Sequence, residues 1–262
     1  CILRKIIESR KKTMDFEEII VSRKNKTVYR NGNTVVKVFE KGHNKGNIFA
    51  EAVNTARMEE CGVPAAKVIS VGELGDRHAI TLERIEGQTL EELMQAHPEK
   101  MDEYLNTFVD LQLSIHQKNC LLLTDLKAKY RRMIEGMTDI GDNTKYEILT
   151  RLDGMKSHNK ICHGDFNPSN VIITKDNKAY VVDWSHTTKG NASADAAMTY
   201  LIFALKDQAL ADKYLDLFSE KSGIEKKNVQ IWLSIVAAAQ LSKGVEEEAE
   251  FLKKWMDVFD FQ

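Results

Sequence analysis

The 262-residue chain has little of what marks several protein classes: it contains only three prolines and four cysteines, and its apolar runs are short. A membrane span needs about 20 consecutive apolar residues, so we expect no membrane association. The cysteines, at positions 1, 61, 120 and 162, form no CxxC or metal-binding cluster, which indicates reduced thiols in a cytoplasmic protein. Basic and acidic residues nearly balance, at 37 against 39, and this excludes a nucleic-acid binder that neutralises many phosphates.

The chain does not begin with methionine, and its first 13 residues are rich in lysine and arginine. They lack the long apolar core of a secretory signal. Met14 opens the run Met14-Asp15-Phe16-Glu17-Glu18. We therefore expect native translation to start at Met14, with residues 1–13 a non-native or disordered leader.

The first 85 residues contain most of the predicted strands. Strands are predicted over 27–30, 34–39, 67–71 and 78–84. Asn31-Gly32 joins the first two as a hairpin, because both residues tolerate positive φ. A helix is predicted over 46–61, with an apolar stripe of Ile48, Phe49, Ala52, Val53 and Ala56.

From Thr89 onward the pattern is mainly helical. Thr89-Leu90-Glu91-Glu92 predicts a capping box at a helix start. One hairpin, with strands at 170–174 and 179–183, interrupts the helices. The sequence thus predicts an α+β protein with a small β-rich N-terminal lobe, residues 14–85, and a larger helical C-terminal lobe, residues 86–262.

The chemistry is concentrated in His163-Gly164-Asp165-Phe166-Asn167-Pro168-Ser169-Asn170, followed by Asp183-Trp184. Phosphoryl transfer needs one carboxylate to accept the proton of the acceptor hydroxyl. It also needs hard oxygen ligands, such as an amide and a second carboxylate, to hold Mg²⁺ on the phosphates. An aspartate, an asparagine five residues later and an aspartate after the hairpin supply this set.

The pattern His-Gly-Asp-x₄-Asn with Asp-Trp resembles the aminoglycoside phosphotransferase and choline kinase superfamily, which has a protein-kinase-like two-lobed fold. The resemblance covers nearly the whole chain from Met14. It implies that Asp165 is the catalytic base and that Asn170 and Asp183 bind Mg²⁺. It further implies that Lys37 contacts the nucleotide phosphates and that Glu51, on the predicted helix, pairs with Lys37.

Leu82-Glu83-Arg84-Ile85-Glu86-Gly87 resembles the hinge of this family. The backbone carbonyl of Glu83 and the backbone N–H of Ile85 would then contact adenine, with Leu82 behind them. The chain has no G-x-G-x-x-G loop, and the hydroxyls of Ser22 and Thr27 are alternatives for contacting the phosphates.

The C-terminal lobe contains one more residue that matches the family and two groups that bear on the acceptor. Asp195 matches an aspartate that braces the catalytic loop in the family. Two features could serve a cationic acceptor: an acidic patch of Glu246, Glu247, Glu248 and Glu250, and an aromatic cage drawn from Trp184, Trp232 and Trp255. Each has a simpler interpretation, a solvated helix face for the glutamates and core packing for the tryptophans.

Only 11 residues, 184–194, separate Asp183 from Asp195. Protein kinases need a longer segment there to bind a peptide, so the acceptor is predicted to be a small molecule. We expect Mg²⁺-dependent transfer of the γ-phosphoryl group of ATP or GTP to a hydroxyl of an aminoglycoside or a metabolite, with a cationic acceptor compatible with the charge. The protein is expected to be a monomer or a weak dimer. The alternative is a catalytically silent nucleotide-binding regulator on the same fold, which the complete set of site residues argues against.

Overall fold

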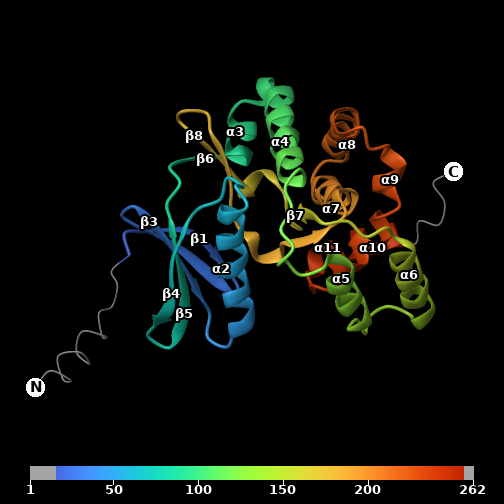
Figure 1. Ribbon diagram of the computed structural model, residues 1–262, viewed down its shortest axis with the longest axis horizontal. Helices are drawn as coiled ribbons and strands as arrows, with labels where there is room; N and C mark the ends of the chain where they lie inside the picture. The colour runs from blue at the N-terminus through green and yellow to red at the C-terminus, as the bar shows by residue number, and fades with distance from the viewer. Residues whose placement is uncertain (1–15, 257–262) are drawn as a thin grey trace, which may run out of the picture.

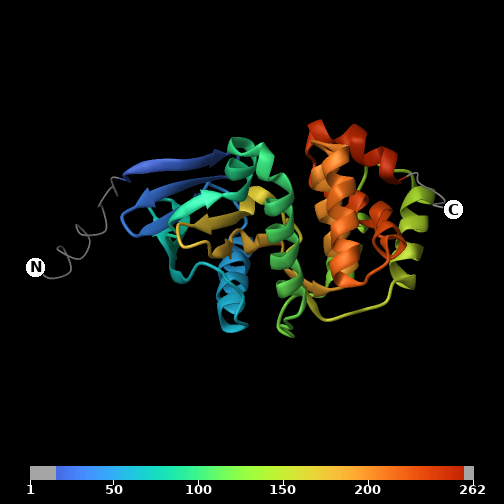
Figure 2. The same ribbon diagram turned by 90° about the horizontal axis from the view of Figure 1, so that it is seen from above.

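The computed structural model of the protein describes residues 16–256. The predicted leader, residues 1–13, lies outside this range. The described chain forms two lobes that lie side by side along the long axis of the molecule (Figure 1). Figure 2 shows the same division from above, with the first sheet on one side and most of the helices on the other. The protein is therefore α+β with the two unequal lobes that the sequence predicts. None of the helices between residues 16 and 256 is long and apolar enough to cross a membrane.

The N-terminal lobe is built on a five-stranded antiparallel sheet with the strand order β1-β2-β3-β5-β4. Its strands are β1 (Glu18–Arg23), β2 (Lys26–Asn31), β3 (Thr34–Phe39), β4 (Val68–Leu74) and β5 (Arg77–Glu83). The predicted hairpin between β2 and β3 is confirmed, but its two turn residues are Gly32 and Asn33, and only Gly32 has positive φ. The sequence did not predict β1, because this edge strand is exposed along its whole length and carries no alternating burial pattern.

Helix α2 (Lys45–Glu60) packs against one face of this sheet. Ile48 and Ala52 are buried there against Phe39 and against residues of β5. The predicted stripe is wrong in part, since Phe49 and Val53 are both 45% exposed. The buried face of α2 instead includes Glu51 and Thr55. The buried face of α2 is therefore not purely apolar. It can include the carboxylate of Glu51 because a lysine on the sheet forms an ion pair with it.

The C-terminal lobe contains the remaining helices and two small sheets. Its helices are α3 (Leu90–Ala96), α4 (Met101–His116), α5 (Leu126–Glu135), α6 (Asp142–Gly154), α7 (Ala192–Ala204), α8 (Gln208–Ser222), α9 (Lys226–Gln230), α10 (Leu233–Leu241) and α11 (Glu246–Met256). The predicted capping box at the start of α3 is confirmed, with Thr89 and Glu92 bonding each other's backbone N–H. These helices surround the two sheets that carry the catalytic motif.

The two small sheets hold both ends of the motif. One is three-stranded, β6 (Gly87–Thr89), β8 (Val171–Thr174) and β9 (Ala179–Val181), and the other pairs β7 (Lys160–Cys162) with β10 (Thr188–Gly190). The predicted hairpin corresponds to β8 and β9. The β-rich stretch that the sequence predicts over 160–183 includes β7, but β6 and β10 were not predicted, since three residues alone show no clear period of two.

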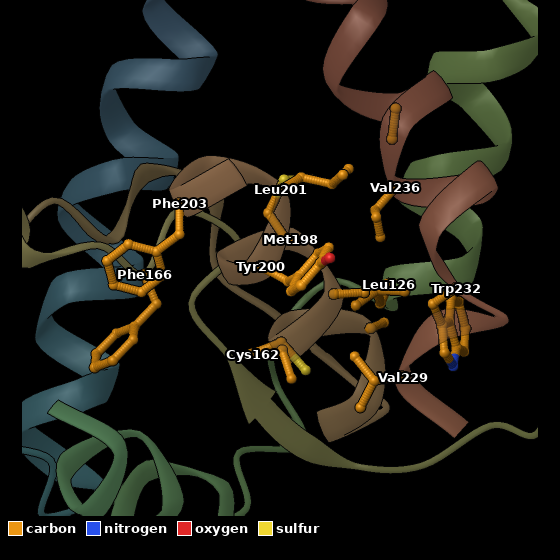
Figure 3. Packing of buried hydrophobic residues seen from close by; sticks show 14 of the residues in the cluster. Leu126, Cys162, Phe166, Met198, Tyr200, Leu201, Phe203, Val229, Trp232 and Val236 are labelled. Atoms are coloured by element: carbon orange, nitrogen blue, oxygen red, sulfur yellow. The ribbon is translucent and has the colours of Figure 1, made fainter. Parts of the chain in front are cut away.

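The main core lies in the C-terminal lobe and is centred on α7 and α10. Leu126 of α5, Met198 of α7 and Val236 of α10 belong to one buried cluster (Figure 3). Both α7 and α10 are buried on nearly every side, as expected for helices without a polar face. Their many alanines let neighbouring elements approach closely, and this fixes the backbone beneath the catalytic loop.

Gly87 of β6 lies where the strands of the three-stranded sheet are closely packed. A Cβ at this position would lie 2.3 Å from the backbone oxygen of Ile173 in β8, so the strand backbone would have to move. We expect Gly87→Ala to lower the free energy of unfolding by about 1–3 kcal/mol, measured by denaturant titration.

Gly72 of β4 is the matched control, since no atom lies within 4 Å of its Cβ position. Gly72→Ala should change stability by no more than about 1 kcal/mol, in the stabilising direction. Equal losses in the two variants would contradict the close contact at Gly87.

Candidate active site

The catalytic loop connects β7 to β8 and contains His163, Gly164 and Asp165. Gly164 has φ +77°, and a Cβ there would lie 2.8 Å from the backbone oxygen of His186. Both the conformation and the contact require glycine. This explains why a glycine stands between the histidine and the aspartate of the motif.

The side chain of Asp165 is held by two amides of its own loop. The Nδ2 of Asn167 donates to Oδ1 at 3.3 Å, and the Nδ2 of Asn170 donates to Oδ2 at 3.2 Å. Both amides also donate to the backbone oxygen of Asp165. The carboxylate is half-buried and its orientation is set before any substrate binds.

His163 connects this loop to the segment before Asp183. Its Nδ1 accepts from the backbone N–H of Asp165 at 3.2 Å, so the proton must be on Nε2, which donates to the backbone oxygen of Val182 at 3.1 Å. The ring is fully buried. His163 thus has a structural role, because it links the backbone at Asp165 to the backbone just before Asp183.

Asn170 and Asp183 provide oxygen atoms suited to a divalent cation. The amide nitrogen of Asn170 is used by Asp165, which leaves the amide oxygen to act as a ligand. Asp183 adopts φ 65°, and its Oδ1 is buried without a hydrogen-bond partner in the described part of the chain. The backbone N–H of Val182 donates to the oxygen of Asn170 at 2.9 Å and so ties the two residues together.

This donor set fits Mg²⁺, which prefers hard oxygen ligands and keeps several waters. Within residues 16–256 no group of three or more His, Cys, Asp and Glu side chains could hold a metal. A site of one amide and one carboxylate, completed by phosphate oxygens and water, is consistent with that finding.

The side chain of Lys37 in β3 contacts one carboxylate in each lobe. Its Nζ lies 2.6 Å from Oε1 of Glu51 on α2 and 3.5 Å from Oδ1 of Asp183. Burial by itself lowers the pKa of Lys37, but the charges of Asp183 and Glu51 outweigh it, so the pKa is raised. The ammonium therefore stays charged, and the structure contains the ion pair that the resemblance implied.

Lys26 of β2 is a site residue that the sequence did not reveal. Its Nζ lies 2.9 Å from Oδ2 of Asp183. Burial raises the pKa of Asp183, but Lys37 and Lys26 oppose it more strongly, and the pKa is lowered overall. The pairing of β2 with β3 is the feature that could have revealed Lys26. Lys26 is opposite Phe39 and Val28 is opposite Lys37, so both lysines lie on one face of the sheet.

The hydroxyl alternatives lie on the other face of the sheet. Thr27 is opposite Val38, which is buried away from α2, and Ser22 is opposite Thr27. Their side chains therefore point away from Lys37. Lys26, rather than Ser22 or Thr27, brings a polar side chain from the β1–β2 hairpin to the site.

The predicted hinge follows β5 on the same side of the molecule. Leu82 is buried against Ile80 and Phe39, and Ile85 packs against that cluster. The backbone N–H of Glu83 donates to the oxygen of Lys67 at 2.8 Å. The N–H of Ile85 has no hydrogen-bond partner among the described residues. Leu82 and Ile85 thus form an apolar surface on the face of the sheet that carries Lys37.

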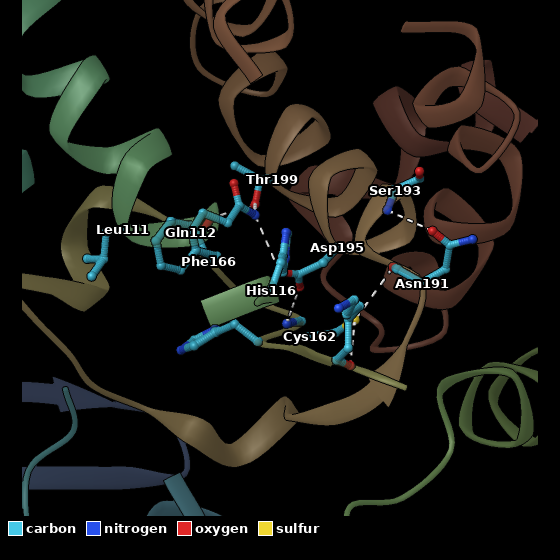
Figure 4. Close-up of polar contacts among 12 residues, drawn as sticks. Leu111, Gln112, His116, Cys162, Phe166, Asn191, Ser193, Asp195 and Thr199 are labelled. Atoms are coloured by element: carbon cyan, nitrogen blue, oxygen red, sulfur yellow. Dashed lines mark hydrogen bonds and ion pairs between the residues drawn. The ribbon is translucent and has the colours of Figure 1, made fainter. Parts of the chain in front are cut away.

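Asp195 of α7 holds the backbone of the catalytic loop, and Figure 4 shows it beside His116 of α4. Its Oδ1 accepts from the backbone N–H of Gly164 at 2.7 Å, and its Oδ2 accepts from Nε2 of His116 at 2.9 Å and from Gln112 at 3.3 Å. Burial raises the pKa of Asp195, but His116 and Gly164 outweigh it, so the pKa is lowered. Sequence reasoning identified neither His116 nor Gln112, because nothing local marks residues of α4 as partners of α7.

Two features that could have served a cationic acceptor are not arranged for it. Trp184 and Trp232 are fully buried, and Trp184 donates its ring N–H to the backbone oxygen of Val181. Glu246 and Glu247 are exposed on the first turn of α11, and Glu248 accepts from Gln240. Trp184 and Trp232 are core residues, Trp255 is partly buried beside Tyr200 and Phe251, and the glutamates mainly form a solvated helix face.

Solved structures with this fold include several kinases. An aminoglycoside phosphotransferase APH(4)-Ia, solved as a ternary complex with ADP and hygromycin B, matches with a TM-score of 0.70 at 14% identity, over 97% of this chain and 96% of that one. The choline kinase LicA from Streptococcus pneumoniae matches with a TM-score of 0.62 at 14% identity, over 98% of each chain. APH(3'')-Id from Streptomyces rimosus matches with a TM-score of 0.61 at 13% identity, over 91% and 97%.

At the level of sequence, no curated protein matches the chain. A family model does match, over residues 16–226, and it describes the phosphotransferase enzyme family that includes the aminoglycoside phosphotransferases. The match covers both lobes and every residue of the site described above. The chain therefore belongs to the phosphotransferase enzyme family.

Proposed function

We propose that this phosphotransferase moves the γ-phosphoryl group of ATP to a hydroxyl of a small molecule, with Mg²⁺ held by Asn170 and Asp183. One observation supports this proposal most strongly. Between the lobes, the structure brings together Asp165, Asn170, Asp183 and the Lys37–Glu51 ion pair. These groups come from four separate segments, and phosphoryl transfer uses them together.

Asp165 acts as the catalytic base in this proposal. Its carboxylate, oriented by Asn167 and Asn170, accepts the proton of the acceptor hydroxyl while the hydroxyl oxygen bonds to the γ-phosphorus. The bond from the γ-phosphorus to its bridging oxygen breaks, and ADP leaves with that electron pair. Most of the rate enhancement would come from positioning and electrostatics.

The phosphate charge is offset by cations from the N-terminal lobe. Lys37 is buried and stays charged, and Lys26 brings a second ammonium to the same place. When bound, Mg²⁺ would supply the remaining positive charge on the phosphates. The side chain of Lys26 thus contacts the phosphates, a role that the backbone N–H groups of a glycine-rich loop can also fill.

Adenine is assigned to the apolar surface of Leu82 and Ile85, where the free N–H of Ile85 can donate to the base. The ADP complex of the APH(4)-Ia structure supports ATP as the donor. GTP is the alternative donor, and parallel assays with the two nucleotides decide between them. A silent regulator is disfavoured because no member of the catalytic set is missing.

Asp165→Ala tests the catalytic base. Loss of the base should reduce turnover by roughly 10²–10⁴-fold. Nucleotide affinity should stay within a few-fold, because Asn170 keeps its hydrogen bond to the backbone oxygen of residue 165 in the alanine variant. Turnover is measured as ADP release across a panel of hydroxyl acceptors, and affinity by calorimetry with Mg²⁺ and a non-hydrolysable ATP analogue.

Asp139→Ala, at an exposed position, is the control and should behave as the wild type. Near-wild-type turnover by Asp165→Ala would remove this residue as the base. If the wild-type protein binds the Mg²⁺–nucleotide complex and transfers phosphate to no acceptor, the silent regulator replaces the proposed enzyme.

Lys26→Met tests the phosphate contact that the structure adds. A charged hydrogen bond contributes about 1.5–3 kcal/mol, so the dissociation constant for ATP should rise about 10-fold or more. Lys24→Met removes the same charge in the exposed turn two residues away and should leave ATP affinity unchanged. Tighter nucleotide binding by Lys26→Met would show instead that Lys26 competes with the metal for Asp183.

A further inference from the structure

Three polar side chains form a chain of hydrogen bonds in the core next to the catalytic loop. They are Gln112 of α4, Thr199 of α7 and Tyr214 of α8, and all three are fully buried. The hydroxyl of Tyr214 donates to Oε1 of Gln112 at 2.7 Å, and Nε2 of Gln112 donates to Oγ1 of Thr199 at 3.2 Å. Oγ1 of Thr199 in turn donates to the backbone oxygen of Phe166 at 3.0 Å. The chain of bonds therefore runs from α8 through α4 and α7 to the residue that follows Asp165.

The carboxylate of Asp195 fixes the direction of these hydrogen bonds. Despite its burial the pKa of Asp195 is lowered, so the carboxylate stays ionised and only accepts. Gln112 must therefore turn Nε2 toward it, at 3.3 Å from Oδ2, and Figure 4 shows Gln112 beside both Asp195 and Thr199. The amide oxygen then faces Tyr214, which stays protonated because burial raises its pKa. Since Thr199 accepts from Gln112, its own proton is free to bond the loop.

Helix α7 thereby holds the loop backbone on both sides of Asp165. Asp195 accepts from the backbone N–H of the residue before it, and Thr199 donates to the backbone oxygen of the residue after it. Asp195 and Thr199 are four residues apart, so they lie on one face of α7. Gln112 bonds to both and keeps these two side chains in place. The backbone of Asp165 cannot move relative to α7 without breaking one of the two bonds.

Packing alone does not require polar side chains at these positions. Valine has the shape of threonine, and an apolar side chain in place of Gln112 would need no hydrogen-bond partners. Hydrogen bonds between buried neutral groups mainly offset the water that those groups lose, and they add little to stability. They differ from apolar contacts in being directional, so they can fix the orientation of a single peptide group.

We infer that Gln112 and Thr199 are positioning residues for phosphoryl transfer. They hold the backbone oxygen of Phe166, and with it the carboxylate of Asp165, in the orientation that the reaction needs. This inference rests on the proposed phosphotransferase activity. Both residues act through the backbone of the catalytic loop and take no part in proton transfer with the acceptor.

Thr199→Val tests the bond to the loop, because valine keeps the shape of threonine and removes the hydroxyl. The kcat should fall about 10-fold. The KM for ATP should stay within a few-fold, since Lys26 and Lys37 are unchanged. Thr199→Ser keeps the hydroxyl and should recover kcat to within a few-fold of the wild type. The kcat is referred to the number of nucleotide-binding sites measured by calorimetry, so that unfolded protein is not counted.

Thr107→Val is the matched control, because Thr107 is exposed on α4 and its hydroxyl donates to the backbone oxygen of Glu103 in the same helix. This variant should have the kcat of the wild type. Equal kcat values in Thr199→Val and Thr199→Ser would overturn the inference.

Gln112→Met tests whether the two side chains act as one chain. Methionine is close to glutamine in shape and has no N–H donor. The single variant should lower kcat several-fold, and the double variant with Thr199→Val should be little worse than Thr199→Val alone, because both changes break the same link. A wild-type kcat in Gln112→Met, or losses that multiply in the double variant, would overturn the role of Gln112.

Hydrogen–deuterium exchange of residues 163–170 reports on the loop without turnover. The N–H groups of this loop are held by hydrogen bonds within it and to α7. Exchange should be faster in Thr199→Val and Gln112→Met, and unchanged in Thr199→Ser and Thr107→Val. Unchanged exchange in both disrupted variants would overturn the inference. Faster exchange in these two variants, with no transfer by the wild type to any acceptor, would support the hold on the loop and count against the proposed function.

Discussion

The site depends on the ion pairs made by the carboxylate of Asp183, because they join charged residues of both lobes. It follows β9 in the C-terminal lobe, yet Lys26 and Lys37 of the N-terminal sheet both pair with it. Glu51 of α2 in turn compensates Lys37. Removal of Asp183 would leave Lys26 unpaired, and removal of Lys37 would leave Glu51 unpaired, which is costly in a partly desolvated place. The relative position of the sheet, α2 and the hairpin is thereby set by electrostatics as well as by packing.

A second buried carboxylate, Asp195, supports the catalytic loop from the opposite side. Its hydrogen bond from the N–H of Gly164 holds the backbone immediately before Asp165, and its other oxygen accepts a hydrogen bond from His116. The helix that carries it, α7, lies in the main core among tightly packed alanines. Packing in the core therefore determines where the loop backbone lies, and the amides of the loop determine how the Asp165 carboxylate is oriented.

The near-neutral composition conceals an uneven distribution of charge. Lys26 and Lys37 both lie within 3.5 Å of the carboxylate of Asp183, so two cations are concentrated at one point between the lobes. The phosphates of the proposed nucleotide would meet these cations there. Such an arrangement stabilises negative charge where it develops and needs no excess of basic residues elsewhere.

The sequence by itself determined the α+β class, the two lobes and the identity of the motif residues. The motif could be predicted because the roles of Asp165, Asn170 and Asp183 follow from short spacings along one loop and one hairpin. The resemblance likewise assigned Lys37, and strand alternation placed it on the inner face of the sheet. Only the tertiary structure decided that Glu51 lies on the buried face of α2, that Lys26 reaches Asp183, and that His116 and Gln112 of α4 bond to Asp195. These contacts join segments separated by tens of residues or more, and their geometry depends on how helices and sheets pack rather than on any local period.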